Sequence, residues 1–212
     1  MRRSLLALRF LQALACLLVC KTVFAVVFSY PSYFPPNFRS DFLLGRSSYF
    51  FGPYQWAFYA HIISGPFTLI AGLVLISESV RLNLPLWHQR LGRLQICCVL
   101  FLVTPSGLWM AWYSATGIIA AAGFATLAVV TAFCVAKGWQ AATQRLFDEH
   151  RRWMLRCFVL LCSAVLLRTI GGISDVLGAG WTYPFAAWLS WLLPLFILES
   201  LLPNQLSLRL RR

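Results

Sequence analysis

The sequence predicts an all-α, polytopic membrane protein with about six transmembrane helices. Of its 212 residues, 60% are hydrophobic and only 11% are charged, and the mean hydropathy is +0.73. A soluble domain of this size needs far more polar surface to face water. Several apolar runs also reach or approach the ~20 residues that a helix needs to cross a ~30 Å hydrocarbon core. Together these observations place the chain in a bilayer.

Six apolar stretches define the predicted spans, which cover residues 4–29, 55–79, 91–113, 117–136, 152–175 and 182–201. They form one integral membrane domain, residues 1–212, in which helices 2 to 5 make an up-and-down bundle. The long outer loop, residues 30–54, is rich in Pro and aromatic residues, which favour the membrane interface. A signal peptide cleaved near Ala25 is the alternative for the first stretch, although Lys21 interrupts its apolar run.

The positive charges predict the orientation of the spans. The formal net charge is +12, and Lys and Arg gather at both termini and in the loops after helices 2 and 4. The outer loop holds only Arg39 and Arg46. Because basic loops stay in the cytoplasm, both termini are predicted to be cytoplasmic, in the cell inner (plasma) membrane. Short basic loops between apolar spans fit an anionic inner leaflet better than they fit nucleic acid.

Two sets of small residues are expected to pack inside the protein. None of the seven cysteines lies in the outer loop, so they are predicted to be small buried hydrophobes rather than a disulfide framework. In helix 4, small residues on neighbouring turns predict a face where another helix approaches closely. This face comprises Gly117, Ala121, Ala125 and Ala132.

Two of the three histidines lie at the cytoplasmic ends of predicted helices. His88 opens helix 3 in "LPLWHQRLGRLQ", and His150 opens helix 5 in "LFDEHRRWMLRCF". In an up-and-down bundle these two helices are diagonal neighbours, so the two imidazoles share one depth across the core. Such a pair is what a bis-histidine haem needs, and it predicts haem b with His88 and His150 as iron ligands.

The faces of the histidine helices carry small or polar residues. Residues 18 apart share a face, and the resulting stripes are Gly92, Gln95 and Ser106 from His88; Met154, Cys157 and Arg168 from His150; and Gly65, Thr68 and Gly72 from His61. Gly92 leaves room for a flat macrocycle or a close helix. The nearby arginines can hold haem propionates, and the candidates are Arg93 and Arg151, together with Arg90 and Arg152.

The surrounding arginines also favour the neutral imidazole that a ligand requires, since they disfavour a further positive charge. The alternative for each histidine is a residue of the helix end that contacts lipid headgroups. The arginines serve the positive-inside orientation in either case.

A second polar layer is predicted nearer the outer side. Lys21, His61 and Arg168 each lie roughly 9–12 Å in from the outer helix ends, at ~1.5 Å per residue. Ionisable side chains at such depth default to a functional role. Asp175 is the expected partner of Arg168, and the layer is predicted to bind substrate, as a pocket for an anion or a quinone headgroup. The alternative is that Lys21 and Arg168 snorkel to the outer headgroups.

Four patterns, "YAHIISGPFTLIAGLVLI", "HQRLGRLQ", "PSGLWMAWYSATG" and "FDEHRRWMLRCF", carry a family resemblance over residues 45–175. The chain resembles a bacterial family of predicted membrane proteins, domain of unknown function 2306, which implies several spans and no particular activity. More distantly, "HQRLG" at residues 88–92 resembles the helix start of the cytochrome b-561 family, which implies a four-helix core with bis-histidine haems. Helix 4 has no histidine, so at most one haem is expected.

These patterns predict a b-type haem protein that transfers electrons, with a quinone or another redox partner. The alternative is a non-redox small-molecule carrier or a membrane assembly factor. The sequence contains no H-E-x-x-H, no G-x-S-x-G and no phosphate-binding loop, so no enzyme class is predicted.

Overall fold

The computed structural model describes residues 2–40 and 42–209, and the described residues contain helices and no strand. The elements are α1 (Arg2–Phe28), η1 (Tyr30–Ser32), α2 (Ser47–Phe50), α3 (Pro53–Ile76), α4 (Glu78–Asn83), α5 (Pro85–Cys98), η2 (Val99–Val103), α6 (Thr104–Trp112), α7 (Ile118–Thr143), α8 (Phe147–Leu161), α9 (Ser163–Val176), η3 (Gly180–Thr182) and α10 (Tyr183–Arg209).

The prediction of six spans is confirmed. Within the described residues, six helical stretches are long and apolar enough to cross a membrane. They are Gln12–Ser32, Pro53–Ile76, Pro85–Trp112, Ile118–Thr143, Phe147–Val176 and Gly180–Leu202. Three of these helical stretches extend beyond the apolar run into the neighbouring polar sequence. The third span, for example, already begins with α5 at Pro85, a residue whose fixed φ suits the first helical position.

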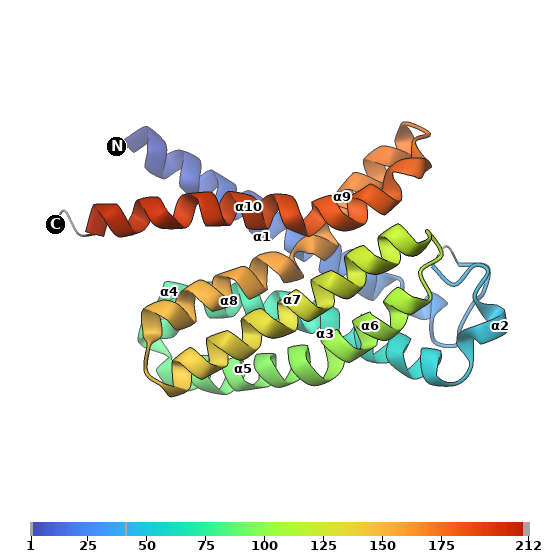
Figure 1. The fold of residues 1–212 in the computed structure, drawn as a ribbon, viewed down its shortest axis with the longest axis horizontal. Coiled ribbons are helices and arrows are strands. Elements are labelled where there is room, and N and C mark those ends of the chain that lie inside the picture. The colour runs from blue at the N-terminus through green and yellow to red at the C-terminus, as the bar shows by residue number, and fades with distance from the viewer. Residues whose placement is uncertain (1, 41, 210–212) are drawn as a thin grey trace.

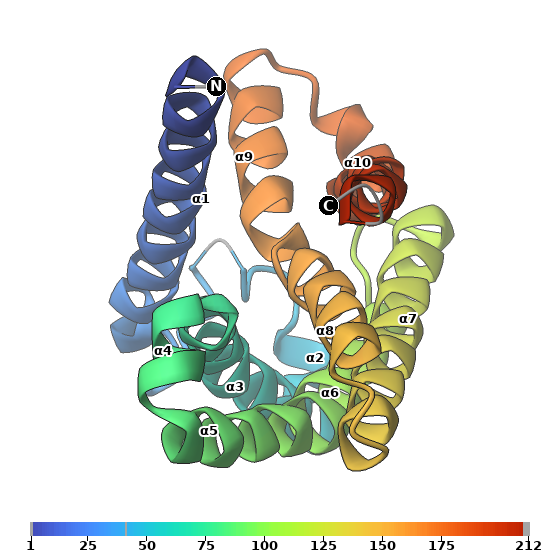
Figure 2. The same cartoon turned by 90° about the vertical axis from the view of Figure 1, so that its left-hand side faces the viewer.

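The helices form two layers. The lower layer is a four-membered bundle in which α3 packs on α5 and α6, α6 on α7, α7 on α8, and α8 closes the ring on α3 (Figures 1 and 2). The second layer holds α1, which packs on α3 and α9, and α10, which packs on α7, α8 and α9. The predicted up-and-down bundle of the second to fifth spans is therefore confirmed.

Successive spans run in opposite directions along the bundle (Figure 1). The start of α1, the end of α10 and the starts of α5 and α8 all lie at one end, which we call the histidine end because it carries His88 and His150. The loop between α1 and α3 lies at the opposite end, which we call the aromatic end. Both termini thus share a side with the two histidines.

Three of the described spans depart from a regular α-helix. The third span contains the π-helical turn η2, which ends two residues before Pro105. A proline has no N–H to donate to the carbonyl four residues back. In α3, Pro66 likewise leaves the carbonyl of Ile62 without its helical donor, and the hydroxyl of Tyr30 donates to that carbonyl at 2.6 Å. The fifth span is divided at Cys162 into α8 and α9, and nothing in its sequence explains the break.

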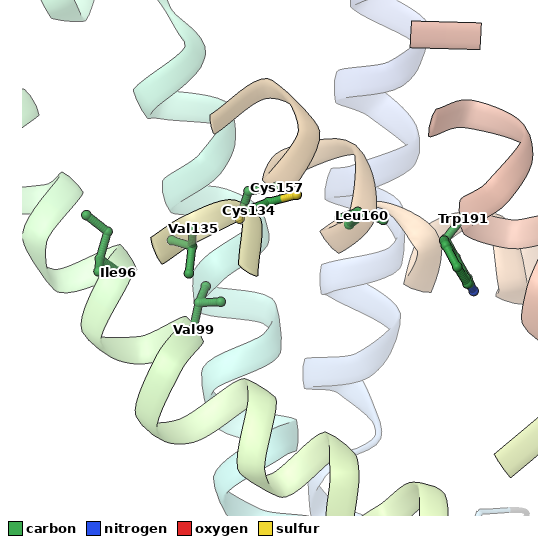
Figure 3. Close-up of a cluster of buried hydrophobic side chains, with 7 residues drawn as sticks. All are labelled: Ile96, Val99, Cys134, Val135, Cys157, Leu160 and Trp191. Carbon is green, nitrogen blue, oxygen red and sulfur yellow. The ribbon is translucent and has the colours of Figure 1, made fainter. Parts of the chain in front are cut away.

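The largest buried cluster joins four spans near the middle of the molecule. It comprises Ile96, Val99, Cys134, Val135, Cys157, Leu160 and Trp191, contributed by α5, η2, α7, α8 and α10 (Figure 3). Many large apolar side chains elsewhere are exposed, such as Trp112, at 85%, and Phe101, at 72%. Exposed apolar surface of this kind suits a protein whose surroundings are lipid.

The aromatic end is closed by the 30–54 loop. Leu43 and Phe50 from this loop are fully buried against Tyr54 and Phe58 of α3. Further rings of the loop and of α6 surround them, in edge-to-face and stacked pairs. The loop is therefore a packed cap over the bundle and not a free connection, and we call it the aromatic cap.

Two packing predictions need correction. In the first half of α7 the buried small residues are Ala120 and Gly123, one or two positions away from the predicted Ala121 and Ala125, which are only partly buried. The reason is that α7 turns this face toward α10, where the indole of Trp188 lies against Gly123. All seven cysteines are free thiols, but only Cys134 and Cys157 lie in the core, since the others face the surface or its margin.

Candidate functional site

His88 and His150 both lie at the histidine end, on diagonal helices of the bundle. His88 lies in the first turn of α5 and His150 in the first turn of α8. Among the described residues, α5 and α8 make no contact as helices, which is the diagonal relation that the sequence predicts. Their imidazoles are nevertheless close enough for a charge on one ring to act on the other.

The two rings differ in how their nitrogens are held. Nδ1 of His150 lies 2.8 Å from the backbone carbonyl of Gly138 in α7. Since a carbonyl only accepts, Nδ1 carries the proton and Nε2 keeps its lone pair free. The Nδ1 atom of His88 is buried and has no hydrogen-bond partner in the part of the chain that the structure describes. One ring is therefore oriented as a metal-bound histidine is, and the other has an open nitrogen.

The remaining residues predicted around the haem lie near this end. Gly92 is half-buried, and a Cβ there would meet only the side chain of Leu75, at 3.9 Å. Its clearance is therefore about one methyl group rather than a porphyrin face. Arg93 and Arg151 are exposed, as is Arg90, whereas Arg152 is half-buried. These guanidinium groups are free to turn toward an anion at the bundle end.

A buried amide lies between the two ends of the bundle. Gln95, on the predicted stripe of His88, is 2% exposed and donates through Nε2 to the carbonyl of Thr68 in α3 at 3.0 Å. Its Oε1 atom has no partner among the described residues. The stripes of His88 and His61 therefore do face each other inside the bundle.

His61 belongs to a different environment from the other two histidines. Its Nδ1 lies 3.1 Å from the hydroxyl of Ser106 in α6, and the ring lies close to the backbone of Val103. The hydroxyl of Ser106 in turn donates to the carbonyl of Leu102. His61 is therefore held by α6, next to the π-helical turn η2.

The predicted second polar layer is only partly assembled. Arg168 is exposed, lies within electrostatic range of His61, and approaches Tyr183 of α10 and Tyr33 of the aromatic cap. Lys21 is exposed on α1, and no contact between Lys21 and these groups is found among the described residues. The predicted pairing of Arg168 with Asp175 is wrong, because the described side chains include no such ion pair and Arg168 donates to the carbonyl of Ala164.

Sequence reasoning missed an ion pair between spans 5 and 6. Nε and Nη2 of Arg156 in α8 donate to the two carboxylate oxygens of Glu199 in α10, at 2.5 and 2.9 Å. The same guanidinium lies over the ring of Trp153, 4.6 Å from its centroid. The available signal was that Arg156 and Glu199 each stand alone as a charge in an apolar stretch. Nothing in the spacing, however, related two residues 43 positions apart.

The fold and these polar sites define a polytopic helical membrane protein whose core is a four-helix bundle. The profile of the family described as Predicted membrane protein (DUF2306) matches residues 58–202. The match covers more than half of the chain and runs from α3 into α10, so the chain belongs to this family. Neither the search of curated proteins nor the search of solved structures found a match.

Proposed function

We propose that this protein binds one haem b between His88 and His150 and transfers electrons in the membrane. One observation carries the proposal: two imidazoles on diagonal helices share one bundle end, and each has a ring nitrogen without a hydrogen-bond partner among the described residues. Nδ1 of His150 is held by the Gly138 carbonyl, and Nδ1 of His88 is buried without a partner. Because a buried polar nitrogen costs about 1–3 kcal/mol when unpaired, such atoms call for a bound group.

The donor set suits haem iron: His88 and His150 would hold it as neutral imidazoles, and the bound group would supply reversible one-electron transfer. The carbonyl of Gly138 sets the tautomer and ring orientation of His150, as an outer-shell partner does in metal sites. Arg93 and Arg151, exposed beside the pair, would offset the two propionates by charge-assisted hydrogen bonds. Because α5 and α8 do not pack on each other among the described residues, the space between the two rings is not a helix–helix interface.

We assign the outer layer of Lys21, His61 and Arg168 to the electron partner, an anion or a quinone headgroup. Arg168 supports this assignment, because its guanidinium carries unused donors and no carboxylate pairs with it among the described side chains. An unpaired cation at membrane depth favours an anionic or strongly accepting partner. The arginine distribution supports an inner-membrane location with the histidine end and both termini in the cytoplasm.

Absorption spectroscopy tests the haem. Protein purified after expression with adequate haem supply should show a Soret band and the sharp reduced-state bands of six-coordinate haem b. His88→Ala and His150→Ala should each abolish or shift these bands, while His61→Ala, the matched histidine variant at the other site, should keep them. Size-exclusion elution of each variant shows whether the bundle is intact.

Three other outcomes would overturn parts of the proposal. If well-folded wild-type protein carries no haem, the redox function falls and a carrier or assembly-factor function replaces it. If only His61→Ala removes the haem, the cofactor is right and its place in the bundle is wrong. If both single variants at His88 and His150 keep unshifted bands, neither residue is an axial ligand.

A further inference from the structure

A cleft of about 280 Å³ lies between α3 and α6, separate from the histidine pair. Trp56 and Trp109 line it together with Phe101 and Pro105, and the side chains of Trp56 and Phe101 are 77% and 72% exposed. Both helices belong to predicted spans. An apolar cleft on such a surface is open to molecules that are dissolved in lipid rather than in water.

The local sequence explains why the cleft is open. On α3, Ala57 and Ala60 present only methyl groups to it. On the other side, the π-helical turn η2 and Pro105 interrupt the regular packing of the third span. π-helical turns occur frequently at functional sites, because the extra residue displaces the side chains that follow it. The two helices therefore do not close against each other at this point.

Among the described residues that line the cleft, Ser106 carries the only hydroxyl, and none of them is charged. Its hydroxyl proton is used, since it donates to the carbonyl of Leu102. The contact at 3.1 Å with Nδ1 of His61 then requires that Nδ1 carry a proton and donate to the serine oxygen. One lone pair of Ser106 Oγ remains, so the cleft offers a hydrogen-bond acceptor to its occupant.

We propose that this cleft binds the ring of an uncharged, membrane-soluble hydroxylated aromatic of the quinol class. A ring hydroxyl donates to Ser106 Oγ, and the flat ring lies among the aromatic walls that include Trp56 and Trp109. Offset stacking and edge contacts with indoles suit a planar ring. A phospholipid headgroup would need a cation that the cleft does not have, and an acyl chain would leave the acceptor on Ser106 unused.

The site is distinct from the Lys21, His61 and Arg168 layer, because it is uncharged and opens between α3 and α6. No residue that lines the cleft belongs to that layer, although Ser106 contacts His61. The binding step needs no haem, so the inference goes beyond the proposed function and its test can be run on protein without haem.

The test uses the full chain in nanodiscs of synthetic phosphatidylcholine, kept anaerobic and reduced. A short-chain benzoquinol is titrated in, and binding is followed by quenching of tryptophan fluorescence. Saturable binding is expected for the wild type. Ser106→Ala should weaken it about fivefold, which corresponds to one neutral hydrogen bond. The matched control is Ser190→Ala, because Ser190 is another buried serine bonded to its own helix and lies on α10.

The ligand supplies a second control. The dimethyl ether of the same quinol cannot donate a hydrogen bond, so it should bind the wild type about fivefold more weakly, and Ser106→Ala should weaken it no further. Wild-type protein without haem should bind the quinol with the same affinity, which separates this site from the haem. The proposal is overturned if binding is not saturable, if Ser106→Ala binds as the wild type does, or if the ether binds as tightly as the quinol.

Discussion

The two ends of the bundle differ in how their polar groups are paired by hydrogen bonds. At the aromatic end, protein groups pair with one another: Tyr30 bonds to the carbonyl of Ile62, Tyr59 to that of Tyr33, and His61 to Ser106. Toward the histidine end, Nδ1 of His88 and Oε1 of Gln95 are buried without partners among the described residues. Most polar groups at the first end are paired within the protein, with Nε of Arg46 as an exception, whereas the second end leaves a ring nitrogen and an amide oxygen without partners.

This difference separates structural polarity from functional polarity within one bundle. A buried polar group that the protein satisfies holds segments together, as the tyrosines hold the aromatic cap on α3. A buried polar group that the protein does not satisfy lowers the free energy of unfolding unless a ligand or water completes it. The histidine end is therefore where bound groups should change stability most, and four substitutions test the contrast.

The largest effect is expected at the ion pair that ties α8 to α10. Arg156→Leu leaves the Glu199 carboxylate without its partner at membrane depth and should lower the free energy of unfolding by about 3 kcal/mol. Adding Glu199→Leu should restore most of this loss. Thermal unfolding in detergent measures it, with the exposed Arg90→Leu as the control. If the double variant is no more stable than Arg156→Leu, the pair is not what stabilises the contact.

The next effect lies where the ends meet, at the contact of α3 with α8. A Cβ on Gly72 would lie 2.5 Å from Cδ2 of Phe158, so Gly72→Ala should cost about 2 kcal/mol by overpacking. Gly65→Ala, on the same helix with no atom within 4 Å of its Cβ, is the matched control. Adding Phe158→Leu should recover stability in the Gly72 variant. Equal melting temperatures for the two glycine variants would contradict this packing.

A smaller effect is expected from the satisfied aromatic end. Tyr30→Phe removes the donor that serves the Ile62 carbonyl and should lower the free energy of unfolding by about 1 kcal/mol. Pro66→Ala returns a backbone N–H to that carbonyl, so Tyr30→Phe should cost less in the Pro66→Ala background. A double-mutant cycle measures the coupling. Identical costs in both backgrounds would show that the hydroxyl does not replace the missing helical bond.

The smallest effect is expected at the unsatisfied amide. Gln95→Met loses the bond to the Thr68 carbonyl but also removes the unpaired Oε1, so the two changes should cancel to within about 1 kcal/mol. Exposed Gln140→Met on α7 controls for the residue type. A loss well above about 2 kcal/mol in the purified protein would show that a water or a bound group completes Gln95, which would sharpen the contrast further.

Much of the architecture was open to prediction because it rests on local properties of the chain. Hydropathy over stretches of ~20 residues marks the spans, and the alternation of spans places His88 and His150 on diagonal helices at one end. The period of the helix placed Gln95 and Ser106 on an inward face, and both are buried. The composition of the 30–54 loop indicated an aromatic surface, although not that its rings pack into a cap.

The tertiary structure alone decided which polar atoms have partners. Arg156 meets Glu199 across 43 positions, Gly72 meets the ring of Phe158, and Arg168 turns to its own helix rather than to Asp175. The rotation of α7 placed Ala120 and Gly123 against their neighbours instead of Ala121 and Ala125. These outcomes depend on how whole helices rotate and tilt to fill space together, and helix period and hydropathy do not encode that choice. The sequence by itself therefore determined the spans and the end where the two histidines meet, while packing determined which nitrogens were left for a ligand.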